Sequence, residues 1–332
     1  MNSNWHDRIG LQYPVMQAGM GGGLSTAELT IAVGQAGGLG TIGLLPPQRF
    51  AEELHHAKRL CNTQPIAANL LMPFVRRAHV DACVEIKPAV TTLFYGYSRR
   101  VVAQLRSAGI FVFHQIGNPA QAQRALADGA DGLIAQGSEA GGHLAGNVLL
   151  SELLPAVREI AGRHPVLAAG GIHDAETVHA AMTLGADGVV AGTRFLLTTE
   201  SHAHPEYKTR LLGATRTLNT RLFGMGWPAP HRVATNAATM RWCSRRTEGP
   251  VWVQAVNTLS VPSRWLLSLN QAERLTGFQQ LAVPLYLPNA LIRTMDACLA
   301  DVTPLYAGIC VGQITKLCSA ADAVRELAAG VG

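Results

Sequence analysis

Charged residues are scarce in this sequence. Only 15% of its 332 residues are Asp, Glu, Lys or Arg, against about 25% in an average soluble protein. The chain is not a disordered segment or a charged scaffold, because 48% of it is hydrophobic and can form a core. Its net charge is +5, and basic pairs such as Arg76-Arg77, Arg99-Arg100 and Arg245-Arg246 are separated by neutral sequence. A nucleic-acid surface needs clustered basic residues, so we do not expect nucleic-acid binding.

Cysteine is also scarce, with six residues that form no C-x-x-C pair. Scattered thiols fit a reducing compartment better than a disulfide framework or a zinc site, and no histidine has the neighbours of a metal-ligand set. The first residues lack the apolar run of a signal peptide. Five glycines interrupt the uncharged stretch 29–48, which therefore does not read as a membrane span. We predict a cytoplasmic protein without a metal or a membrane contact.

Short apolar runs alternate with helical patterns over the first 200 residues. The runs have the length of buried strands and cover residues 15–17, 39–43, 66–70, 90–94, 110–115, 132–136, 166–169 and 188–191. Apolar residues three and four apart predict helices between them, over residues 50–60, 101–107, 120–127, 149–161 and 175–184. Eight strands, each followed by a helix, are the number that closes an α/β fold of the (β/α)8 TIM-barrel type. A doubly wound open sheet uses the same units and is the alternative.

The alternation stops after Thr193. Residues 211–302 are polar and Arg-rich at first, then rich in Leu and aromatic residues, with no βα repeat. This stretch roughly accounts for the excess over a typical barrel of about 250 residues. We therefore predict a barrel over residues 1–210, an inserted and mostly helical lid over residues 211–302, and a C-terminal segment over residues 303–332. An amphipathic helix at 320–327 would return that segment to the barrel.

One glycine motif is a false signal. Residues 38–43 satisfy G-x-G-x-x-G, but a dinucleotide-binding turn lies between a strand and a following helix. Here the glycines follow a helix and lie on a strand, and Pro46-Pro47 comes next. We therefore expect no dinucleotide-binding turn at this position.

A stronger glycine signal comes later in the chain. Ala169, Gly170 and Gly171 end the seventh predicted strand, and Gly192 and Thr193 end the eighth. The loops after these two strands are the usual phosphate site of a barrel, where bare backbone N–H groups can meet an anion. The alternative is that these glycines serve only to turn the chain. Two such loops on neighbouring strands favour the phosphate site.

A histidine follows the sixth predicted strand. The segment 136–143 reads QGSEAGGH, so two glycines precede the imidazole of His143 on the side of the barrel that carries active sites. An imidazole there can exchange a proton near neutral pH, although a single loop histidine is more often an ordinary surface residue. His114, beside Gln115 at the end of the fifth strand, is a weaker candidate.

Several segments, in this order along the chain, resemble the nitronate monooxygenase (2-nitropropane dioxygenase) family, which includes the FMN-dependent enoyl-acyl-carrier-protein reductases. The match covers about residues 10–210 and extends into the predicted lid. The segments that carry it are YPVMQAGM at 13–20, AGGLG at 36–40, EAGGH at 139–143, AAGGI at 168–172, LGADG at 184–188, GTRF at 192–195, ESHAHPEYK at 200–208 and WPAPHRV at 227–233.

The resemblance implies an FMN-binding barrel with a helical lid. His143 matches the catalytic histidine of the family, and Gln115 stands where some members have Lys. The cofactor residues implied by position are Gln17, Ala18, Gly19 and Met20 under the isoalloxazine ring, Asn69, Gln115 and Gln136 as polar partners, and Ala169, Gly170, Gly171, Gly192 and Thr193 around the phosphate.

Three functions follow from this resemblance. The favoured one is a nitronate monooxygenase, which oxidises an alkyl nitronate with O2 to a carbonyl compound and nitrite. The alternative is an NAD(P)H-dependent enoyl-thioester reductase, and a weaker one is a flavin-binding protein without catalysis. All three share the same cofactor residues, and the sequence is also compatible with a homodimer.

Overall fold

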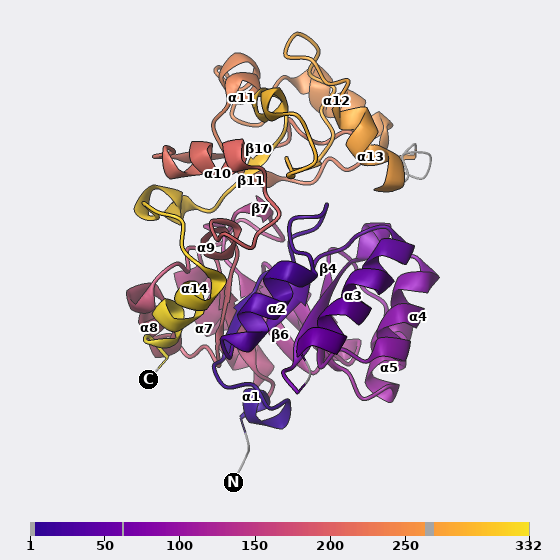
Figure 1. The fold of residues 1–332 in the computed structure, drawn as a ribbon, viewed down its shortest axis with the longest axis vertical. Helices are drawn as coiled ribbons and strands as arrows, with labels where there is room; N and C mark the ends of the chain where they lie inside the picture. The colour runs from indigo at the N-terminus through magenta and orange to yellow at the C-terminus, as the bar shows by residue number, and fades with distance from the viewer. Residues whose placement is uncertain (1–3, 62, 263–268, 332) are drawn as a thin grey trace. The chain divides into compact units, whose positions relative to one another are not determined.

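The computed structural model describes residues 4–61, 63–262 and 269–331 (Figure 1). Contacts within the chain divide it into two units. The barrel unit comprises Met1–Glu139, Ala145–Ser201 and Leu317–Gly332, and the second unit comprises Ala140–Leu144 and His202–Lys316. The division falls a few residues before the predicted start of the lid and some residues after its predicted end. Residues 263–268 of the predicted lid lie outside the described residues.

The barrel unit contains a sheet of eight parallel strands. In sequence order they are β1 (Val15–Gln17), β2 (Gly40–Ile42), β3 (Ile66–Leu71), β4 (Val90–Phe94), β5 (Phe111–Ile116), β6 (Gly132–Gln136), β8 (Val166–Ala169) and β9 (Val189–Ala191). Their spatial order is β1-β9-β8-β6-β5-β4-β3-β2. The two end strands approach each other through a parallel bridge between Met16 and Leu39, and the N–H of Gln17 donates to the carbonyl of Leu39 at 2.9 Å. The TIM barrel is confirmed, and the open sheet is excluded.

Helices follow the strands and cover the outside of the sheet (Figure 1). They are α2 (Ala27–Gln35), α3 (Pro47–Cys61), α4 (Arg77–Ile86), α5 (Arg99–Ser107), α6 (Pro119–Ala127), α7 (Leu150–Ala161), α8 (Ala175–Thr183) and α9 (Thr193–Leu196). A short helix α1 (Trp5–Arg8) precedes the barrel, a 3-10 turn η1 (Met72–Phe74) follows β3, and α14 (Ala320–Ala328) is the C-terminal helix. Helix α2 precedes β2, so the glycines of residues 38–43 do lie after a helix and on a strand.

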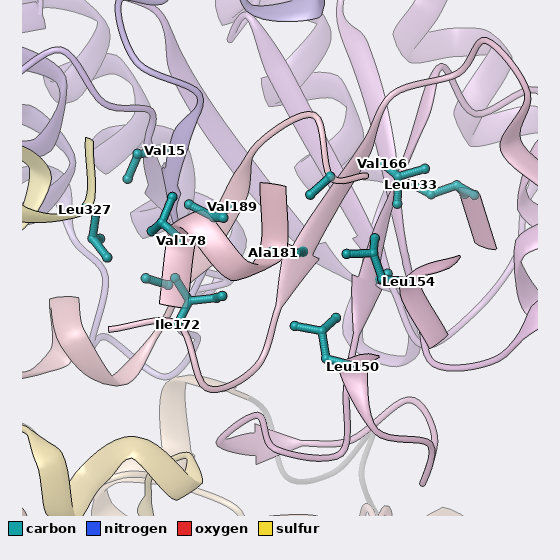
Figure 2. Packing of buried hydrophobic residues seen from close by; sticks show 14 of the residues in the cluster. Val15, Leu133, Leu150, Leu154, Val166, Ile172, Val178, Ala181, Val189 and Leu327 are labelled. Carbon is teal, nitrogen blue, oxygen red and sulfur yellow. The ribbon is translucent and has the colours of Figure 1, made fainter. Parts of the chain in front are cut away.

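Separate hydrophobic clusters lie outside and inside the barrel sheet. The outer one joins alternate strand residues to the helices, and Figure 2 shows part of it, including Val15, Val166, Val189 and Leu327. The inner one fills the barrel with the residues between them, such as Met16, Phe113 and Leu167. Because side chains alternate along a strand, these clusters identify which face each strand residue presents.

The second unit contains a small antiparallel sheet as well as helices. Its strands are β7 (Gly142–His143), β10 (Thr217–Thr220), β11 (His231–Ala234) and β12 (Leu305–Tyr306), with β11 paired to the other three. The helices are α10 (Pro205–Leu212), α11 (Ala237–Trp242), α12 (Val251–Leu259) and α13 (Leu269–Thr276), with 3-10 turns η3 (Ala297–Asp301) and η4 (Ile309–Gln313). The predicted lid was mostly helical, so this sheet was not expected. Across the described residues, none of the helices combines the length and the apolar character that crossing a bilayer requires.

Candidate functional site

The carboxyl ends of the barrel strands bring most of the sequence-predicted cofactor residues to one place. Met16, Ala67, Phe113, Ile134 and Val190 belong to the inner cluster. Two residues further along each strand, the side chain returns to the same face. This alternation places the following positions on the inner face at the carboxyl end, where active sites of barrels are built: Ala18, Asn69, Gln115, Gln136 and Gly192. Ala169 is itself a member of the inner cluster.

Gln17 lies on the outer face of the sheet, and its side chain forms hydrogen bonds within the protein. The residue is fully buried. Its Oε1 accepts from the backbone N–H of Thr41 at 2.9 Å, and its Nε2 donates to Ser25 Oγ at 2.8 Å and to the carbonyl of Ala18. The amide therefore ties the end of β1 to β2 and to the following loop. A ligand inside the barrel can therefore contact the backbone of Gln17 but not its side chain.

Asn69 positions the loop that follows β1. Its Nδ2 donates to the carbonyl of Gly19 at 3.1 Å, and a Cβ atom at Gly19 would lie only 2.2 Å from the Cβ of Asn69. Glycine is therefore required for this close approach. The next residue, Met20, is half-buried, and its N–H donates to Ser25 Oγ at 3.0 Å.

Two glutamines lie at the ends of neighbouring strands. Gln136 is buried, and its Oε1 accepts from the N–H of Ala145 at 2.8 Å. Gln115 is half-buried, and its amide has no hydrogen-bond partner within residues 4–61, 63–262 and 269–331. Gln115 can therefore offer both a donor and an acceptor to a bound molecule.

Two glycine-containing loops follow β8 and β9, which are neighbours in the sheet. Gly170 and Gly171 have φ angles of +117° and +75°, a region that favours glycine. A Cβ at Gly171 would have Glu139 Cβ as its nearest neighbour at 3.8 Å, and one at Gly192 would have Ala18 Cβ at 3.7 Å. At both glycines an added Cβ would therefore make only ordinary van der Waals contact, so these positions are not crowded.

Backbone N–H groups in these loops are available for a ligand. Those of Gly171 and Gly192 donate to no acceptor among the residues that the structure describes, whereas the pairing of Ala169 with Val190 directs the N–H of Gly170 to the carbonyl of Val190. The N–H of His173 is already used by Thr177 Oγ1 at 3.1 Å. Backbone N–H groups without an acceptor, in loops that are not crowded by side chains, fit an anion such as a phosphate.

His143 belongs to the second unit, where it lies in a group of rings. It pairs with His231 in the register of β7 and β11. Its imidazole stacks on Trp227 with the ring centroids 3.7 Å apart, and the Tyr306 ring lies at 5.4 Å. Burial, followed by the charge that His231 would carry, holds the pKa of His143 well below its ordinary value. The imidazole is therefore neutral at pH 7 and able to accept a proton.

The weaker candidate, His114, does not reach the inside of the barrel. Its neighbours Phe113 and Ile116 belong to the inner and outer clusters, so alternation turns His114 outward to the helices. Its ring stacks on Tyr97 at 4.6 Å, and burial lowers its pKa to about 4. This histidine is a packing residue.

His231, Trp227 and Tyr306 were not among the residues predicted for the site. The first two fall in the segment 227–233 that carried part of the resemblance, and this was the only available signal. Tyr306 gave none, because it reaches His143 through the pairing of β12 with β11.

A sequence profile of the nitronate monooxygenase family matches residues 2–74 and 72–330, which is almost the whole chain. The chain belongs to the nitronate monooxygenase family. The resemblance stated from the sequence is thereby confirmed.

Members and neighbours of this family carry several activities in their names. The chain is 35% identical over 233 residues to (3aS,4S,5R,7aS)-5-hydroxy-7a-methyl-1-oxo-octahydro-1H-indene-4-carboxyl-CoA dehydrogenase of Mycobacterium tuberculosis. That match covers 68% of this chain and 64% of the relative, so it spans less than two thirds of the relative's length.

Solved structures share the fold over the whole chain. Nitroalkane oxidase of Streptomyces ansochromogenes has a TM-score of 0.76 and 26% identity, covering 99% of this chain and 98% of that one. FabK of Thermotoga maritima has a TM-score of 0.79 and 24% identity, covering 100% and 96%. At these identities the likeness to FabK concerns the fold alone.

Proposed function

We propose that this protein is an FMN-dependent oxidoreductase that oxidises alkyl nitronates with O2 to a carbonyl compound and nitrite. The observation that supports the cofactor is the pair of N–H groups at Gly171 and Gly192, which donate to no acceptor among the described residues. They lie in the two loops where barrels bind phosphate. Nitro compounds are favoured as substrates by the family's name and by the structural neighbour named a nitroalkane oxidase.

The inner face of the barrel supplies the rest of the cofactor site. Gly170, Gly171, Gly192 and Thr193 would hold the phosphate, with Ala169 beside them. Ala18, Gly19 and Met20, with the backbone of Gln17, would support the ring, and Asn69, Gln115 and Gln136 would be its polar partners. The flavin supplies the electron transfer between substrate and O2 when it is bound.

His143 has two roles in this proposal. A nitronate is an anion, and a ring N–H of His143 would orient its nitro oxygens by donating to them. With a neutral nitroalkane, the unprotonated ring nitrogen would remove the proton from the carbon that bears the nitro group. The lowered pKa of His143 keeps the ring neutral, so one nitrogen is free of a proton for this step.

Reduction of an enoyl thioester with NAD(P)H is the second candidate. It is favoured by the relative named a carboxyl-CoA dehydrogenase and by the charge of the second unit. That unit contains twelve Lys and Arg residues against five Asp and Glu, a net charge of +7, whereas the barrel unit has a net charge of −2. A basic unit suits the phosphates of a CoA thioester or of NADPH.

Anaerobic mixing separates the candidates. Purified protein is expected to be yellow, or to bind added FMN, and its flavin absorbance should bleach rapidly with propionate 3-nitronate and slowly with NADH. Bleaching by the nicotinamide alone would favour the reductase. Replacement His143→Ala should slow bleaching by about 100-fold or more while the protein still binds FMN. A flavin-binding protein without catalysis would show slow turnover that His143→Ala leaves unchanged.

A further inference from the structure

His231 is a buried histidine with one ring nitrogen that no described neighbour uses. Its side chain is fully buried, and its Nδ1 lies 2.9 Å from the carbonyl oxygen of Ala229. A carbonyl oxygen only accepts, so Nδ1 carries the hydrogen and Nε2 is left with a bare lone pair. In the part of the chain that the structure describes, Nε2 has no hydrogen-bond partner. An unused buried acceptor costs free energy, so it requires a functional explanation.

The nearest candidate for a donor is His143. The two histidines are register partners on β7 and β11, and their ring centroids are 5.2 Å apart. At this separation, one nitrogen of each ring comes within hydrogen-bonding distance when those two nitrogens face each other. The stack on Trp227 restricts how far the His143 ring can turn. The structure thus holds two imidazoles in a fixed pair.

The surroundings of the pair are almost free of charge. The hydroxyl of Tyr306 donates to the carbonyl of Pro288 at 3.0 Å, and burial raises the pKa of Tyr306 far above neutrality. Arg221 acts on His231 from a distance, and its own guanidinium lies 3.7 Å from Glu248. Burial lowers the pKa of His231 to about 4. At neutral pH, His231 therefore acts on His143 as an uncharged ring with a lone pair.

We propose that His231 is a positioning residue for His143, and that its Nε2 accepts a hydrogen bond from His143 when His143 takes up a proton. This inference rests on the proposed function, with a neutral nitroalkane as substrate. The C–H bond beside the nitro group breaks, its electron pair stays on the nitronate, and the proton goes to His143. An imidazolium has an N–H on both nitrogens, and one of them is directed to His231.

Such an acceptor matters because His143 is half-buried and the loss of solvent around its ring already lowers its pKa. Burial disfavours the charged form of an imidazole, and the described neighbours of the pair supply no carboxylate that shifts the pKa of either ring. The lone pair of His231 stabilises the imidazolium and makes His143 a stronger base. A substrate that has already lost its proton does not need this assistance.

Two forms of one substrate test the proposal. Nitroethane must lose a proton, whereas ethylnitronate has lost it already. Replacement His231→Phe keeps an aromatic ring and removes the acceptor. We expect kcat/KM for nitroethane to fall about tenfold or more, while kcat/KM for ethylnitronate stays within about twofold of the wild-type value.

Matched variants control for packing. His231→Gln retains an amide donor for Ala229 and an acceptor for His143, so it should recover most of the nitroethane activity. His114→Phe removes another buried neutral histidine, on the outer face of the barrel, and should leave the ratio of the two substrates unchanged. If His231→Phe does not fold, His231→Leu removes the same acceptor in a smaller side chain.

A second measurement needs neither the flavin nor turnover. NMR titration of labelled histidine in the flavin-free protein should give a lower pKa for His143 in His231→Phe than in His231→Gln, because both variants lack the charge of His231 that lowers this pKa and only Gln keeps an acceptor. An equal or higher pKa in His231→Phe, or an equal loss of activity on both substrates, would overturn the role of His231. Failure of the wild type to oxidise ethylnitronate would overturn the proposed function instead, and the titration would still decide the role of His231.

Discussion

At the residue scale, Gly192 is the glycine of the proposed phosphate site whose replacement is easiest to interpret. Gly192 has φ of −106° and ψ of −70°, which any residue can adopt. The backbone conformation therefore does not require glycine at position 192. By the alternation along β9 its position faces the inside of the barrel, and the nearest atom to an added Cβ is Ala18 Cβ at 3.7 Å. The absence of a side chain here suits a ligand and is not needed by the fold.

Replacement Gly192→Ala should separate binding from stability. The added methyl group would stand between the N–H group and the phosphate, so we expect the Kd for FMN to rise about tenfold or more. The free energy of unfolding should change by less than about 1 kcal/mol. Flavin fluorescence titration and urea denaturation measure the two quantities.

The matched control is Gly213→Ala in the second unit. Its backbone is also compatible with alanine, and its nearest contact would be Thr209 O at 3.8 Å. This variant should bind FMN as the wild type does. If the wild type, Gly192→Ala and Gly213→Ala bind FMN with equal affinity, the phosphate does not bind at the Gly192 loop.

His114 links stability to pH. Its pKa is lowered by burial to about 4, whereas an unfolded histidine titrates near 6.5. Between these values the unfolded chain binds the proton more readily, so stability is complete above about pH 6.5 and falls as the pH drops toward 4. The loss attributable to this one residue is about 3 kcal/mol.

Chemical denaturation at pH 7 and near pH 4.5 should show this loss. His114→Phe removes the titrating ring, so the difference in unfolding free energy between the two pH values should shrink. Replacing His55, whose side chain is 59% exposed, should leave that difference as it is in the wild type. A pH dependence in His114→Phe as steep as in the wild type would contradict the assignment.

At the scale of elements, the C-terminal helix α14 is a structural part of the barrel unit. Its Ala320, Ala323, Val324 and Leu327 are fully buried in the outer cluster, together with strand residues such as Val15 and Val189 (Figure 2). Ser319 caps its N-terminus by accepting from the N–H of Asp322 at 3.0 Å. The helix therefore returns the end of the chain to the barrel, and it buries its apolar face there.

Leu327→Ala should destabilise the protein by about 2–5 kcal/mol, because it leaves a cavity in a packed cluster. Leu317→Ala, just before the helix, removes a side chain that is 40% exposed and should change stability by less than about 0.5 kcal/mol. Thermal or urea unfolding of the two variants gives the comparison. Similar losses for both would show that α14 is not packed as described.

At the scale of the whole molecule, charge is unevenly distributed between the units. The second unit carries +7 and the barrel unit −2, although the composition of the chain as a whole is only mildly basic. A unit with this excess attracts anions over a distance set by the ionic strength. The net charge of the whole chain, +5, does not reveal the larger positive charge of the second unit.

Salt should therefore affect the two forms of the substrate differently. Raising NaCl from about 0.05 M to about 0.5 M is expected to lower kcat/KM for anionic ethylnitronate several-fold, by screening the attraction. Neutral nitroethane serves as the control, and its kcat/KM should stay nearly constant. Steady-state assays at a series of salt concentrations measure both, and an equal response of the two would rule out electrostatic attraction.

The sequence by itself determined the barrel. The strands at residues 15–17, 90–94, 132–136 and 166–169 have the bounds that were predicted. Strands buried on both faces are short, nearly continuous apolar runs between glycines and prolines, and this local pattern survives in the sequence. The two glycine loops after β8 and β9 were found for the same reason.

Tertiary structure alone decided the small sheet and the partners of His143. Strands β7, β10, β11 and β12 are two to four residues long and mix polar with apolar residues, so no local pattern marks them. The facing of His143 and His231 depends on the register of β7 with β11. Register is set by pairing between segments distant in sequence, and only the folded chain brings those segments together.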